Sequence, residues 1–66
     1  MNKLISKEAR AKQFVEIFKN ARLEPFEIRE YFKGFLEMNG YKDIDFRTVE
    51  DKNILQIVYK GLGVIE

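Results

Sequence analysis

The stretch Leu23-Glu24-Pro25 separates two amphipathic segments and decides the fold that the sequence predicts. Pro25 lacks a backbone N–H and cannot continue a helix, and its ring disfavours helical geometry at Glu24. Proline does suit the first turn of a new helix. The sequence therefore predicts one helix that ends before this hinge and a second helix that begins at Pro25.

The segment before the hinge is predicted to be a helix over residues 7–21. Ser6 is a suitable N-cap, and Glu8 places an acidic side chain in the first turn. Apolar side chains then recur with the period of a helix. They are Ala11, Phe14, Val15, Phe18 and Ala21.

The segment after the hinge is predicted to be a second helix over residues 25–38, ended by Asn39-Gly40. Its apolar stripe consists of Ile28, Tyr31, Phe32, Phe35, Leu36 and Met38. Because the link between the helices is short, they are expected to lie antiparallel, stripe against stripe.

The pattern changes from residue 43 onward and favours β-structure. Apolar and polar residues alternate over Ile44–Thr48, and residues 54–59 are rich in β-formers. Strands are therefore expected at residues 43–49 and 54–60, with a turn at Glu50–Asn53. The expected fold class is α+β: an antiparallel two-helix hairpin followed by a C-terminal β-hairpin, all in one small domain.

Length and composition exclude several classes of function. The chain has 66 residues with no cysteine and no histidine, so disulfides, thiolate ligands and imidazole chemistry are absent. The carboxylates lie among lysines and arginines on faces that read as solvated, where a shifted pKa is not expected. The sequence therefore predicts a protein that is not an enzyme and uses no cofactor, metal or small-molecule substrate.

Association is the means of stabilisation left to so short a chain. Aromatic residues make up 14% of the sequence, more than one small core needs. We therefore expect an interaction module that binds a regulator or another protein partner and forms a homodimer. The expected interface comprises Phe14, Phe18, Phe26, Ile28, Tyr31, Phe32 and Phe35, with Phe26 as an exposed anchor.

Two alternatives follow from other features. Residues 1–22 hold six basic and two acidic side chains, so the first helix could contact nucleic acid through Lys12, Lys19 and Arg22. The outer face of the second helix is acidic, which makes DNA the weaker expectation. The other alternative is an accessory subunit whose β-hairpin adds a strand to a larger partner. No apolar run reaches the length of a membrane span, and a cytoplasmic location is expected.

Residues 14–36 resemble a known helical hairpin. Ala21, Leu23, Pro25 and the run Glu27-Ile28-Arg29 followed by Tyr31-Phe32 are similar to the hairpin of the Sin anti-repressor family. The resemblance implies dimerisation by interlocked helix pairs and sequestration of a transcription repressor. It also implies a shared core of Phe14, Phe18, Ile28, Tyr31 and Phe32.

Overall fold

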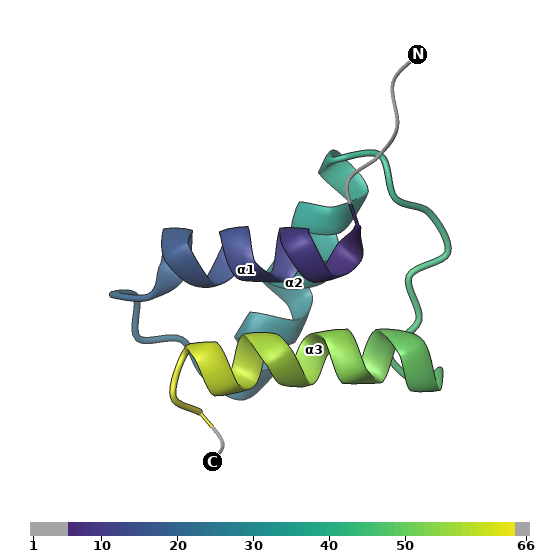
Figure 1. The fold of residues 1–66 in the computed structure, drawn as a ribbon. Helices are drawn as coiled ribbons and strands as arrows, with labels where there is room; N and C mark the ends of the chain where they lie inside the picture. The colour runs from purple at the N-terminus through teal and green to yellow at the C-terminus, as the bar shows by residue number, and fades with distance from the viewer. Residues whose placement is uncertain (1–5, 65–66) are drawn as a thin grey trace.

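The computed structural model describes residues 6–64 and contains three helices (Figure 1). They are α1 (Lys7–Phe18), α2 (Pro25–Met38) and α3 (Val49–Gly61). No residue in this range forms a strand. The predicted α+β class is therefore wrong, and the fold is all-helical.

Helix α1 begins where Ser6 predicts and ends earlier than expected. The Ser6 hydroxyl accepts a hydrogen bond from the backbone N–H of Ala9 at 3.1 Å, which caps the first turn. The helix ends at Phe18 rather than at residue 21, and the Ala21 N–H donates to the Phe18 carbonyl at 2.9 Å in a turn. The chain needs residues 19–24 to redirect itself before α2.

Helix α2 has the bounds that its end signals predict. Pro25 occupies the first turn, and the Glu27 carboxylate accepts a hydrogen bond from the Glu24 N–H at 2.8 Å. At the other end Gly40 has a φ of 94°, a left-handed conformation that glycine adopts without strain.

Helix α3 replaces the predicted second strand, residues 54–60. The expected turn at Glu50–Asn53 is the first part of this helix, because the Thr48 hydroxyl accepts a hydrogen bond from the Asp51 N–H at 3.3 Å. Leu55 and Val58 point into the core one turn apart. Helix packing on two sides outweighs the β-propensity of the segment.

The predicted first strand, residues 43–49, is mostly the connection between α2 and α3. Its alternating pattern has a different cause: the chain runs along the core and turns Ile44 and Phe46 toward it. Ile44 is buried, and the Phe46 ring stacks on Phe32 with centroids 6.0 Å apart. The β-hairpin is therefore wrong in both strands.

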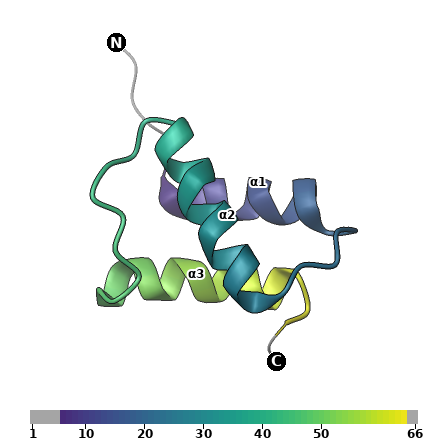
Figure 2. The ribbon, with the colours of Figure 1, turned by 180° about the vertical axis from the view of Figure 1, so that it is seen from behind.

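The helices are not arranged as a simple hairpin. Helices α1 and α3 lie side by side and run in the same direction, while α2 crosses behind them in Figure 1 and in front of them in Figure 2. Helix α1 packs more extensively against α3 than against α2. The expected pairing of the α1 and α2 stripes is thus only part of the core, which all three helices share.

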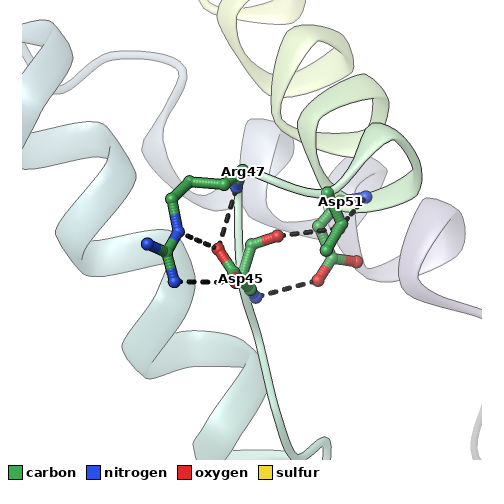
Figure 3. A network of polar contacts seen from close by, with 4 residues as sticks. Asp45, Arg47 and Asp51 are labelled. Atoms are coloured by element: carbon green, nitrogen blue, oxygen red, sulfur yellow. Dashed lines mark hydrogen bonds and ion pairs between the residues drawn. The ribbon is translucent and has the colours of Figure 1, made fainter.

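A buried carboxylate joins the N-terminal ends of α1 and α3. Asp51 is 4% exposed, and its carboxylate lies 2.6 Å from the Lys7 ammonium nitrogen. Its other oxygen accepts a hydrogen bond from the Asp45 N–H at 3.0 Å (Figure 3). We call Lys7, Asp45 and Asp51 the Asp51 junction. It connects α1, the α2–α3 loop and α3 at one point.

Arg47 stabilises the loop on the outer side of this junction. Its guanidinium donates to both oxygens of the Asp45 carboxylate, at 3.0 and 3.1 Å, and its backbone N–H donates to the same group (Figure 3). These hydrogen bonds hold the pKa of Asp45 below its ordinary value. The contact therefore adds to the stability of the fold at pH values above the pKa that Asp45 has in the unfolded chain. This added stability is lost as the pH falls through the lower pKa of Asp45 in the folded chain.

Phe14 lies at the centre of the core. Its ring is fully buried and contacts Phe18, Phe32 and Phe35 with centroid distances of 4.4, 5.2 and 5.5 Å. Such tilted and edge-on pairs add to the stabilisation from burial alone. The other buried apolar residues are Ala11, Ile28, Phe32, Leu36, Tyr41, Ile44, Leu55 and Val58.

Substitution by alanine is predicted to have opposite effects on stability at Gly34 in α2 and at Gly61 in α3. A Cβ at Gly61 would lie 2.6 Å from a methyl carbon of Val15, whereas one at Gly34 would meet nothing within 4 Å. We expect Gly34→Ala to raise the free energy of unfolding by about 1 kcal/mol. Gly61→Ala should lower it by about 1 kcal/mol, because overpacking exceeds the gain in helix propensity.

Urea denaturation of both variants measures these changes. Adding Val15→Ala to Gly61→Ala should recover part of the loss, because it removes the side chain that the new Cβ contacts. Equal stabilisation by alanine at both positions would contradict the close approach of α1 and α3.

Candidate protein-binding groove

An apolar groove lies on the outer side of α2, where the end of α1 meets it. Its volume is about 380 Å³, and we call it the α2 groove. The residues that line it are Phe18, Glu30, Tyr31, Gly34, Phe35 and Met38. Glu30 is the one charged residue among them.

The position of the groove follows from the spacing of residues along α2. Ile28, Phe32 and Leu36 recur at four-residue intervals and form the fully buried face. Tyr31 and Met38 are seven residues apart and share the neighbouring face, where they are 49% and 88% exposed. The second apolar face of α2 is therefore left largely uncovered by the chain itself.

Rings that reach into the core hold the walls of the groove. Phe18 and Phe35 both contact the central Phe14 ring, and Phe18 also lies against Tyr31 with centroids 6.1 Å apart. These contacts fix three aromatic side chains of the groove. Met38 is the last residue of α2 and is 88% exposed, and the flexible methionine side chain suits adaptable binding surfaces.

Gly34 is one of the residues that line the groove. A methyl group at this position would contact no neighbouring atom within 4 Å, so the missing side chain is not required by packing within the chain. Glycine nevertheless costs about 1 kcal/mol relative to alanine inside a helix. The absence of a side chain leaves the backbone of α2 open to close approach from outside.

The charged residues of α2 are not separated onto two sides. Arg29, Glu30 and Lys33 line a separate polar hollow of about 580 Å³ under the α2–α3 loop, together with Asp43, Asp45 and Arg47. Glu30 also lines the α2 groove, whereas Glu37, two helical turns further along, is not among the groove residues. Among residues 6–64 neither carboxylate forms an ion pair.

The structure divides the predicted interface residues into three groups. Phe14, Ile28 and Phe32 lie in the core of the single chain, with at most 1% of each residue exposed. The groove contains Phe18, Tyr31 and Phe35. Phe26 is 62% exposed but is not among the groove residues, so the structure does not bring it together with the others.

The predicted nucleic-acid contacts are all exposed. Lys19 and Arg22 line a third hollow of about 320 Å³ beside the end of α3, whereas Lys12 lies elsewhere on α1. Lys19 also forms an ion pair with Glu16 at 3.7 Å, and the nearby carboxylate weakens the attraction of Lys19 for a phosphate. DNA binding through these three side chains stays a prediction, and their positions in the structure do not add support to it.

Residues 6–64 show neither a metal-binding group nor a membrane-spanning helix. Within the part of the chain that the structure describes, no group of three or more acidic, histidine or cysteine side chains is placed to hold a metal ion. No helix in residues 6–64 has the length and apolarity needed to cross a membrane. The α2 groove is the candidate site because exposed apolar side chains cluster there.

Comparisons with known proteins add no relative. No family model, no curated protein and no solved structure matches this chain. The resemblance of residues 14–36 to the Sin anti-repressor hairpin accordingly stays a prediction.

Sequence reasoning placed Met38 on the core-facing stripe of α2, where the structure leaves it 88% exposed. The spacing does indicate two faces. On a helix of 3.6 residues per turn, Met38 and Tyr31 lie well away from the row formed by Ile28, Phe32 and Leu36. A wide apolar stripe can thus combine a core face with a separate exposed face.

Because the groove is exposed, its outer residues should contribute little to folding. We expect Met38→Ser to change the free energy of unfolding by less than about 0.5 kcal/mol. Phe32→Ala, on the buried face of the same helix, should cost about 3–5 kcal/mol. Urea denaturation of the two variants compares them directly. A large loss of stability in Met38→Ser would mean that the methionine packs within the chain and is not free for a partner.

Proposed function

We propose that this chain is a small protein-interaction module that binds a protein partner in the α2 groove and has no catalytic role. The observation that carries the proposal is the uncovered second apolar face of α2. Tyr31 and Met38 are substantially exposed there beside Phe18 and Phe35, although the chain has a separate core. Clustered exposed apolar side chains mark interaction sites more often than isolated ones do.

The composition of the groove supports a protein rather than a small molecule as ligand. Tyrosine, phenylalanine and methionine are enriched at protein interfaces, and the two aromatic side chains give large contact area at low entropic cost. Small-molecule sites add several convergent polar groups to an enclosed cavity. The α2 groove offers only Glu30 and the Tyr31 hydroxyl as polar side-chain groups, and its walls are open to solvent.

The absence of strands in residues 6–64 removes one alternative. A partner cannot add a strand to the predicted β-hairpin, because those residues form a loop and α3. The proposal keeps the interpretation made from the sequence, which is that the chain regulates another protein by binding it in the cytoplasm. The sequence features behind it are the short chain and its high aromatic content.

A paired-variant pull-down tests the proposed function. Tagged chain would be used as bait in extract of the source cells, and co-purified proteins would be quantified by mass spectrometry. We expect at least one protein to be retained by the original sequence and lost with Gly34→Glu, which adds a charged side chain at a groove position where a Cβ would meet no atom within 4 Å. Circular dichroism would show that this variant keeps its helices.

The matched control is Val49→Glu, because Val49 is 75% exposed and lies outside the groove at the start of α3. An acidic residue at that position also agrees with the helix dipole. Retention of the same proteins by both variants would contradict the groove as the binding site.

A further inference from the structure

We draw no further inference here: the strongest candidate, the exposed apolar face of α2 beside the end of α1, belongs to the groove already described, and nothing in the structure shows what covers it.

Discussion

The buried carboxylate of Asp51 is the interaction on which the arrangement of the three helices depends. A carboxylate that is 4% exposed is costly unless it is paired and hydrogen-bonded. Asp51 meets that requirement through the Lys7 ammonium and the Asp45 N–H, which come from α1 and from the loop before α3. These partners hold the first turn of α3 against the first turn of α1, and so the two helices run in the same direction (Figure 1).

The parallel pairing of α1 and α3 determines which face of α2 is buried and which stays exposed. The α2 helix crosses both neighbours, so its row of Ile28, Phe32 and Leu36 suffices to close the core (Figure 2). Its second apolar face then remains beside the end of α1 as the α2 groove. A simple antiparallel hairpin would have turned a larger share of the α2 stripe toward α1. The exposed groove is thus a consequence of the same packing that buries Phe14.

The sequence allowed the prediction of α2 and of the start of α1, because Ser6, Pro25 and Asn39-Gly40 are strong local end signals. The third helix was predicted wrongly, since β-branched residues and an apparent turn outweighed a helical signal that was also present. Thr48 followed by Asp51 is a capping pattern, and Leu55 and Val58 have helical spacing. The sequence separates the aromatic residues of the core from those of the groove only in part, because periodicity alone does not show which side of a wide stripe faces the core. Lys7 and Asp51 are 44 residues apart, and nothing local indicates their contact.

A double-mutant cycle on Lys7 and Asp51 tests most directly whether the junction organises the fold. The free energy of unfolding would be measured by urea denaturation for Lys7→Met, Asp51→Asn and the double variant, with the exposed pair Lys19 and Glu16 as the reference cycle. The account predicts a coupling of about 1–3 kcal/mol at the junction and a much smaller coupling at the reference pair. Additive effects of Lys7→Met and Asp51→Asn, within about 0.3 kcal/mol, would contradict it.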